Sequence, residues 1–164
     1  MRRTLAHLLT TRYSLRRRFP PATLAAIETA IAVAEREHAG EIRFAIETCF
    51  DLRRLWSGCA ARTRAGEVFA KLRVWDTAGH NGVLIYLLLA DRDIEIVADR
   101  GYDGRVTPAE WQAVCASMEA QFRAGQFEAG AIAGIRAVAA LAARSFPPLP
   151  GDRNELPDPP ALVR

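Results

Sequence analysis

The sequence predicts an α/β domain in which a small mixed sheet is flanked by helices. Two observations carry this prediction. The uncharged apolar run 82–90 is typical of a central strand buried on both faces, and the alternating segment 93–98 that follows it predicts an antiparallel partner. Helical periodicity precedes and follows this pair. With 164 residues, the chain has the length of one ordinary domain.

The elements before this pair are expected to be a helix, a strand and a helix. A proline pair opens a helix over 20–38. The alternating segment 41–47 predicts a strand covered mainly on one face. The segment 52–72 predicts a helix in one or two pieces, because glycines interrupt it. Its apolar residues are expected to face inward: Leu55, Trp56, Cys59, Val68, Phe69 and Leu72.

Two helices are expected after the strand pair. Thr107, Pro108 and Glu110 supply the N-cap, the first-turn proline and the N3 glutamate of a capping box. A last helix over 127–145 carries small residues that allow close packing against a neighbouring element. The predicted core contains the following side chains: Leu84, Tyr86, Leu88, Ile94, Ile96, Trp111, Met118 and Phe122.

The two ends of the chain differ from the domain between them, 19–146. Residues 1–18 hold six arginines and no acid, whereas the remaining chain holds 16 basic residues against 19 acidic ones. This basic N-terminal arm is consistent with a short amphipathic helix that meets a protein partner or an anionic membrane surface, or with a partly ordered extension. Residues 147–164 hold six of the nine prolines and are expected to form a Pro-rich tail without helix or sheet.

Composition argues against several classes of protein. The longest uncharged apolar run has nine residues, whereas a membrane-spanning helix needs roughly 20, so we expect no transmembrane segment. The arm lacks the features of a secretory signal, which favours a cytoplasmic location. Three cysteines without a CxxC spacing predict neither a disulfide framework nor a zinc site. No nucleic-acid binding is expected, because the basic charge belongs to the arm and no recognisable module accompanies it.

Two polar loops should meet at the open end of the predicted hairpin. If Asp91 and Arg92 form a two-residue turn, His80 faces Asp103 across the strands. The loops 76–81 and 99–104 then form one cleft. Its polar members are Asp76, His80, Asn81, Asp99, Arg100 and Asp103.

Such a cleft suits either a divalent cation held by carboxylates or a phosphate held by arginine and loop amides. We expect Asp76 and Asp103 to be the metal ligands for Ca²⁺ or Mg²⁺, with no organic cofactor. The other candidate ligand-binding residues are His80, Asn81, Arg100, Gly101 and Tyr102. The alternative is ordinary polar loops in which aspartates cap turns. Standard catalytic motifs are absent, so the sequence assigns no catalytic residue.

Several short motifs, in their order and spacing, resemble the TPM domain family, which is named for a thylakoid lumen protein, a photosystem II accessory protein and a worm receptor modulator. The motifs, over about residues 22–145, are Trp75, Asn81-Gly82-Val83-Leu84, Asp91-Arg92, Gly101-Tyr102 and Phe122-Arg123-Ala124-Gly125-Gln126-Phe127 followed by Gly130. The resemblance implies a three-layer α/β/α domain. It also implies one of three roles: an acid phosphatase without a dedicated cofactor, a divalent-cation binder, or an assembly or repair factor.

The sequence departs from the family at the expected site. Members often have Gly-Tyr-Gly followed a few residues later by an acid. Here the third position of the motif is Asp103, and the position of the later acid corresponds to about Pro108, so no acid stands there. A family site is therefore either degraded or rebuilt with Asp103 and Asp76. We expect a small domain that acts by binding a divalent cation or a protein partner. The alternative is an acid phosphatase that uses the same loops.

Overall fold

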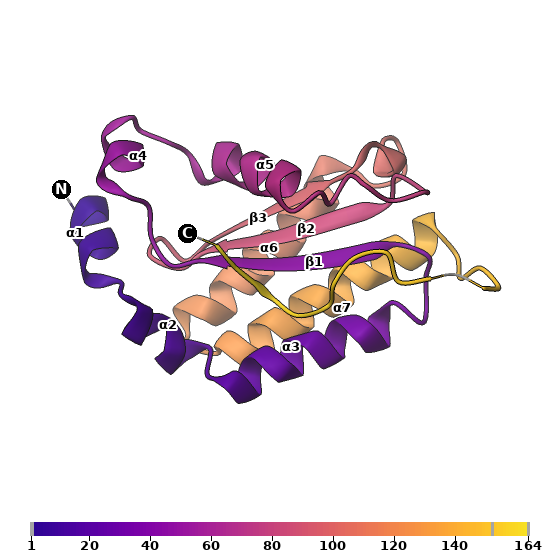
Figure 1. The fold of residues 1–164 in the computed structure, drawn as a ribbon, viewed down its shortest axis with the longest axis horizontal. Helices are drawn as coiled ribbons and strands as arrows, with labels where there is room; N and C mark the ends of the chain where they lie inside the picture. The colour runs from indigo at the N-terminus through magenta and orange to yellow at the C-terminus, as the bar shows by residue number, and fades with distance from the viewer. Residues whose placement is uncertain (1, 152, 164) are drawn as a thin grey trace.

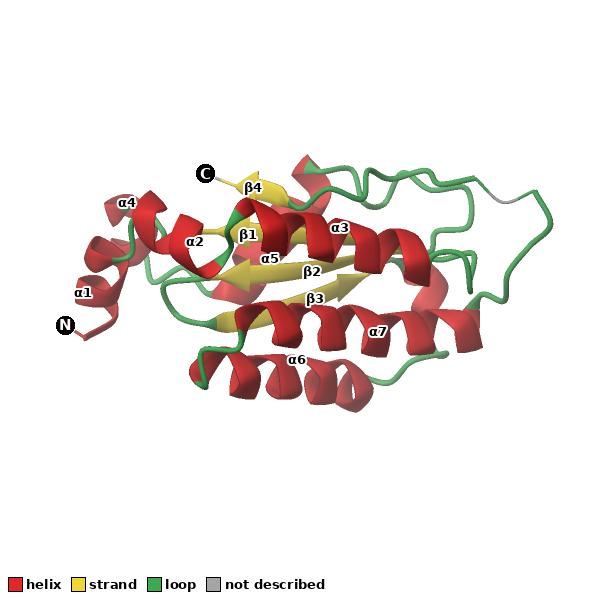
Figure 2. Cartoon of the chain, turned by 90° about the horizontal axis from the view of Figure 1, so that it is seen from below, coloured by secondary structure: helices red, strands yellow, loops and turns green. Residues whose placement is uncertain are grey.

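The computed structural model describes residues 2–151 and 153–163. Within these ranges a four-stranded mixed sheet has helices on both faces (Figures 1 and 2), which confirms the predicted three-layer α/β fold. The strand order is β3-β2-β1-β4. The strands are β1 (Glu41–Glu47), β2 (Gly82–Leu88), β3 (Asp93–Ala98) and β4 (Ala161–Val163).

Strand β2 is the interior strand that the apolar run predicted. It pairs parallel with β1 and antiparallel with β3, and all seven of its residues are buried. Its side chains alternate between the two hydrophobic cores: Val83, Ile85 and Leu87 enter one core, and Leu84, Tyr86 and Leu88 enter the other. Strand β1 is also covered on both faces, so the expectation of one-sided cover was wrong.

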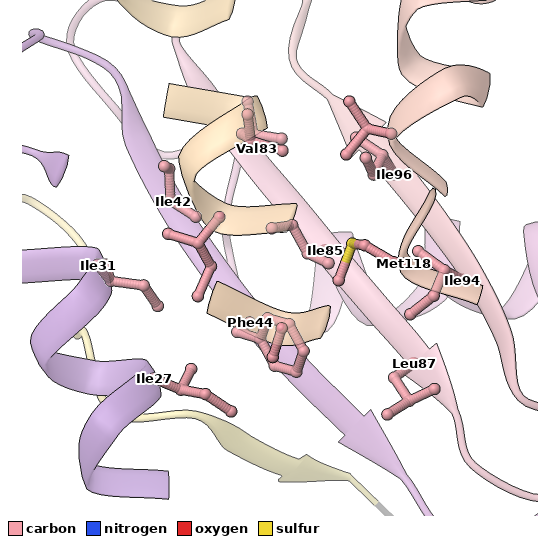
Figure 3. Close-up of a cluster of buried hydrophobic side chains, with 14 of the residues drawn as sticks. Ile27, Ile31, Ile42, Phe44, Val83, Ile85, Leu87, Ile94, Ile96 and Met118 are labelled. Carbon is pink, nitrogen blue, oxygen red and sulfur yellow. The ribbon is translucent and has the colours of Figure 1, made fainter. Parts of the chain in front are cut away.

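Three helices cover one face of the sheet: α3 (Pro21–Ala34), α6 (Pro108–Arg123) and α7 (Phe127–Ser145). Isoleucines of α3 and Met118 of α6 meet the apolar side chains of β1, β2 and β3 in the larger core (Figure 3). Met118 lies against Gly134 of α7, where a Cβ atom would come within 2.6 Å of its Cγ and Cε. Of the predicted core, seven residues are buried, and Trp111 is only partly buried.

Helices α4 (Leu52–Trp56) and α5 (Ala61–Lys71) lie on the other side, which confirms a helical segment in two pieces. Helix α5 covers the second core, in which Arg64 donates two hydrogen bonds to Glu47 at 2.8 and 3.2 Å. The Tyr86 hydroxyl donates to the same carboxylate at 2.6 Å. The expectation that Trp56 faces inward was wrong, because its side chain is 79% exposed at the end of the short α4.

The predicted capping box at the start of α6 is confirmed. The Glu110 N–H donates to the Thr107 hydroxyl at 3.3 Å, and the Glu110 carboxylate accepts from the Thr107 N–H at 2.8 Å. Arg144 pairs with the same carboxylate at 2.7 Å. These contacts lower the pKa of Glu110 to about 2, the hydrogen bond from the Thr107 backbone being the largest cause.

The C-terminal segment joins the sheet, so the expectation that it forms no sheet was wrong. Strand β4 pairs parallel with β1, with Ala45 opposite Ala161. The prolines precede this strand and do not interrupt it. Before the strand, the Glu41 carboxylate accepts backbone hydrogen bonds from Glu155 and Leu156, both at 3.1 Å. The segment is therefore attached to β1 at two places.

The N-terminal arm forms two helices, α1 (Arg2–Leu9) and α2 (Arg12–Arg18). Thr11 separates them as the N-cap of α2. Both lie at the end of the sheet toward which β1 and β2 run, and α1 lies beside α4 (Figures 1 and 2). No helix of the described residues is long and apolar enough to cross a bilayer.

Candidate functional site

The two polar loops do meet at the open end of the β2–β3 hairpin, but the register differs by two residues from the expected one. Leu88, not Ala90, pairs with Asp93. The Asp99 N–H therefore donates to the Gly82 carbonyl at 2.9 Å, and the Gly101 N–H donates to the His80 carbonyl at 3.0 Å. His80 consequently lies beside Asp99 and Arg100, and the expected pairing of His80 with Asp103 was wrong.

The side chain of His80 lies between those of Asp99 and Arg100. Arg100 Nη2 is 2.5 Å from His80 Nε2, and Asp99 Oδ2 is 3.4 Å from His80 Nδ1. Because a guanidinium can only donate, Nε2 is an acceptor and the ring proton sits on Nδ1, facing Asp99. Asp99 Oδ2 is buried and accepts no hydrogen bond from the described residues. The 3.4 Å between His80 Nδ1 and Asp99 Oδ2 is thus within the range of an ion pair, but the two atoms form no hydrogen bond.

The backbone around this cluster holds the three side chains at the protein surface. His80 adopts a left-handed conformation with φ of 49°, which histidine tolerates better than most side chains. Asp99 is the N-cap of a 3₁₀ turn, Arg100–Tyr102, and its Oδ1 accepts from the Arg100 N–H at 2.8 Å. The His80 side chain is 44% exposed and that of Asp99 12%. A ligand can therefore reach His80 and Arg100, with Asp99 behind the ring.

Three of the predicted ligand-binding residues are structural. Asn81 is buried, and its side-chain NH₂ group donates to the Ala39 carbonyl. The backbone carbonyl of Asn81 accepts a hydrogen bond from the Tyr102 hydroxyl at 3.1 Å. Tyr102 is 2% exposed and meets Phe146 edge-on, with ring centroids 4.9 Å apart, and burial raises the pKa of its hydroxyl. At Gly101 a Cβ atom would overlap the His80 carbonyl oxygen and lie 2.9 Å from Phe146 Cζ.

The two predicted metal ligands are placed in different surroundings. The Asp76 side chain is 49% exposed, and its carboxylate pairs with Arg73 at 2.5 Å. Asp103 is an exposed residue that follows the 3₁₀ turn, and its N–H donates to the Arg100 carbonyl at 3.0 Å. Within the part of the chain that the structure describes, no group of three or more His, Cys, Asp or Glu side chains is arranged to hold a metal ion. The donor set therefore does not form a preassembled cation site.

The loop that carries His80 is held by tight backbone contacts. At Gly82 a Cβ atom would overlap the carbonyl oxygen of Val74, so only glycine fits at the start of β2. The Ala78 N–H donates to the carboxylate of Glu155 at 3.1 and 3.2 Å. The C-terminal segment thus contacts the loop as well as β1. Much of the motif around Asn81 and Gly101 therefore serves to assemble this end of the sheet.

These features define a class of protein: a three-layer α/β domain with a small polar cluster at its hairpin end. The TPM domain model matches residues 16–141, which is most of the chain, and the chain therefore belongs to the TPM domain family. None of the curated proteins matches the chain.

Three solved structures share the fold. BA42 protein from the psychrophilic bacterium Bizionia argentinensis is 30% identical, with 87% of this chain and 93% of that chain covered and a TM-score of 0.76. The N-terminal domain of a P. gingivalis protein is 17% identical, with 77% of each chain covered and a TM-score of 0.61. The N-terminal domain of cg2496 from Corynebacterium glutamicum is 16% identical, with 76% and 74% covered and a TM-score of 0.55. The last two support the fold alone.

Proposed function

We propose that this TPM domain acts by binding, and that its ligand is a small phosphate-bearing molecule held by His80 and Arg100. The observation that carries the proposal is the 2.5 Å contact between Arg100 Nη2 and His80 Nε2 at an exposed surface. Two nitrogen-bearing side chains in contact, one of them a permanent cation, are suited to sharing the oxygens of one anion. Asp99 behind the ring gives His80 a carboxylate partner when it becomes charged.

Binding follows from a redistribution of donors within this cluster. Phosphate oxygens would take the guanidinium donors that Arg100 now directs at His80. His80 Nε2 is then released from Arg100. When this nitrogen carries a proton, it can donate a hydrogen bond to the same phosphate. The Nδ1–H of the ring faces Asp99, whose Oδ2 is 3.4 Å away.

The cation expected from the sequence, Ca²⁺ or Mg²⁺ at Asp76 and Asp103, stays a prediction. The Asp76 carboxylate is already paired with Arg73, so a cation bound by Asp76 would have to compete with this guanidinium. With two carboxylates and no preassembled cage, affinity would be weak, of the order of millimolar. Binding of a protein partner, which the sequence analysis expected through the basic N-terminal arm, also stays a prediction.

Phosphomonoester hydrolysis is the second candidate function, and the Asp99–His80 pair favours it. A histidine backed by a carboxylate can hold a proton at Nε2 for a leaving oxygen. Hydrolysis requires in addition a nucleophile or activated water within about 3–3.5 Å of the phosphorus. The described cluster supports binding directly, whereas it supports hydrolysis only through this one proton-transferring group. Binding therefore comes first.

The proposal can be tested by NMR titration of ¹⁵N-labelled protein with inorganic phosphate at constant ionic strength. Shifts confined to the amides of His80, Arg100 and their neighbours support it, as does a loss of affinity of roughly tenfold in Arg100→Gln. Arg36→Gln, at another exposed arginine, is the matched control and should bind as the parent does. An unchanged affinity in Arg100→Gln would contradict the proposal.

Two further arms of the experiment separate the alternatives. A titration with calcium to about 10 mM should shift the amides near Asp76 and Asp103 only if the cation binds, and the double Asp→Asn variant should then lose the response. Hydrolysis of an aryl phosphate above background, lost in His80→Gln, would favour the enzyme. Phosphate binding without turnover supports a binding domain.

A further inference from the structure

One end of the molecule carries an unusual collection of exposed apolar side chains. Of the ten large apolar residues that are exposed in the described chain, six lie on or beside the three short helices α1, α2 and α4. These are Leu5, Leu8, Leu9, Tyr13, Leu52 and Trp56. Figures 1 and 2 both place α1 and α4 next to each other at this end. We call these six residues the apolar end.

Helix α1 is oriented so that its polar face packs against the domain. Leu5, Leu8 and Leu9 share one helix face by their spacing, and Arg3 and His7, four apart, share the opposite face. His7 is 2% exposed, whereas the three leucines are 57 to 67% exposed. A helix that contributes to a core turns its leucines inward. This orientation leaves the leucines available to another apolar phase.

Specific polar contacts hold α1 in that orientation. The Phe50 N–H donates to His7 Nδ1 at 2.9 Å, so His7 Nε2 carries the proton and donates to Asp91 Oδ1 at 3.0 Å. Arg3 Nε donates to the other oxygen of Asp91 at 2.9 Å. The helix is thus fixed to the loop after β1 and to the β2–β3 turn by its polar side chains. The outward direction of the leucines follows from these bonds.

The N-terminal helices that carry most of the apolar end are basic. Residues 1–18 contain no acid, and Arg12, Arg16 and Arg17 of α2 are exposed. Arg53 of α4 is also exposed, beside Trp56. Basic residues that surround exposed leucine, tyrosine and tryptophan form the composition that binds the interface of an anionic bilayer. Tyrosine and tryptophan are moreover the side chains that prefer the headgroup level.

We propose that the apolar end docks the protein on the surface of an anionic lipid bilayer. Leu5, Leu8 and Leu9 would enter the acyl boundary, Tyr13 and Trp56 would sit among the headgroups, and the arginines of α2 would meet lipid phosphates. A bilayer suits this surface because the six apolar side chains project from separate short helices, and a fluid interface accepts them without a complementary shape. The site at His80 lies at the open end of the β2–β3 hairpin, whereas α1 is bound to Asp91 at the turn end, so the site would face away from the membrane.

The test is co-sedimentation of the full chain with vesicles of phosphatidylcholine, with and without about one-third phosphatidylglycerol. Binding to the anionic vesicles that greatly exceeds binding to the neutral ones, and that weakens with added salt, is the expected result. Replacing Arg12, Arg16 and Arg17 by Gln should lower the partition coefficient at least about tenfold. The matched control replaces three exposed arginines elsewhere by Gln and should change binding far less. These are Arg36, Arg136 and Arg153.

The apolar contribution is tested separately. The pair Leu8→Ser and Leu9→Ser should reduce binding without loss of folding, because both side chains are exposed. Leu149→Ser, at a leucine 64% exposed outside the apolar end, is the control. Trp56 fluorescence should shift to the blue with anionic vesicles, and Trp56→Phe should remove that shift. Absence of binding to anionic vesicles would overturn the proposal, and so would lipid-free self-association that Leu8→Ser abolishes, since a second copy would then be the occupant.

Discussion

The contact between Met118 and Gly134 predicts a strong coupling between two substitutions in the larger core. Met118 of α6 is 1% exposed, and a Cβ atom at Gly134 of α7 would lie 2.6 Å from its Cγ and Cε and closer still to its Sδ. The Met118 side chain therefore fills the space that a side chain at position 134 would need. A larger residue at 134 is tolerated only if the side chain at 118 is smaller or moves. Met118→Ala and Gly134→Ala, made singly and together, measure this dependence.

The magnitudes follow from the geometry. Met118→Ala should lower the free energy of unfolding by about 2–5 kcal/mol, because it removes a buried side chain and leaves a cavity. Gly134→Ala alone crowds Met118 at a cost of about 1–3 kcal/mol, offset by about 1 kcal/mol of helix propensity. In the Met118→Ala background the crowding disappears, so Gly134→Ala should stabilise by about 1 kcal/mol. The coupling energy is then about 1–3 kcal/mol.

The assay is urea unfolding of the four proteins, followed by far-UV circular dichroism and compared at equal m-values. Gly66→Ala is the matched control, because a Cβ atom at this α5 position has nothing within 4 Å. It should stabilise by about 0.5–1 kcal/mol in either background, without coupling. If the coupling between Met118→Ala and Gly134→Ala is below about 0.5 kcal/mol, the close packing of α6 on α7 does not depend on this pair.

Two other predictions concern the cap and a titrating carboxylate. Thr107→Ala should lower the free energy of unfolding by about 1 kcal/mol, and Thr107→Ser should restore it in the same urea assay; a null effect would mean that the capping bond contributes nothing. Burial, with the carboxylates of Glu95 and Glu119, raises the pKa of Asp93 to about 6. The folded chain holds the Asp93 proton more tightly than the unfolded chain does. Protonation of Asp93 therefore adds to the free energy of unfolding below the ordinary aspartate pKa, and this addition is lost as pH rises through about 6. Asp93→Asn should flatten that decline in unfolding titrations between about pH 4 and 6, and an unaltered slope would contradict the assignment.

The strands and most helices could be predicted from the sequence because apolar periodicity reports burial directly. The hairpin register could not, since it depends on a contact outside the hairpin. The N–H groups of Leu89 and Ala90 donate to the carbonyls of Glu47 and Thr48, at 2.9 and 3.1 Å. Strand β1 thus holds these two residues in line with β2, and the chain can reverse only over a longer turn than the expected two residues.

The candidate site was predicted at the right end of the sheet but with the wrong partners. The two-residue change in register replaced Asp103 by Asp99 as the neighbour of His80. Asn81 and Tyr102 belong to a recognisable motif, yet both are buried and hold the strand ends together. Polar residue types in a loop do not by themselves distinguish a side chain that binds a ligand from one that satisfies the backbone. Only the hydrogen-bond partners make that distinction.

The short strand β4 has a consequence for the behaviour of the protein in concentrated solution. Without it, the outer side of β1 would present unpaired N–H and C=O groups along an apolar strand, which is the template on which sheets of different molecules join. Strand β4 covers the last residues of β1, and it is itself three residues long and preceded by prolines, which makes it a poor template in turn. The Pro-rich segment therefore protects the sheet from edge-to-edge aggregation.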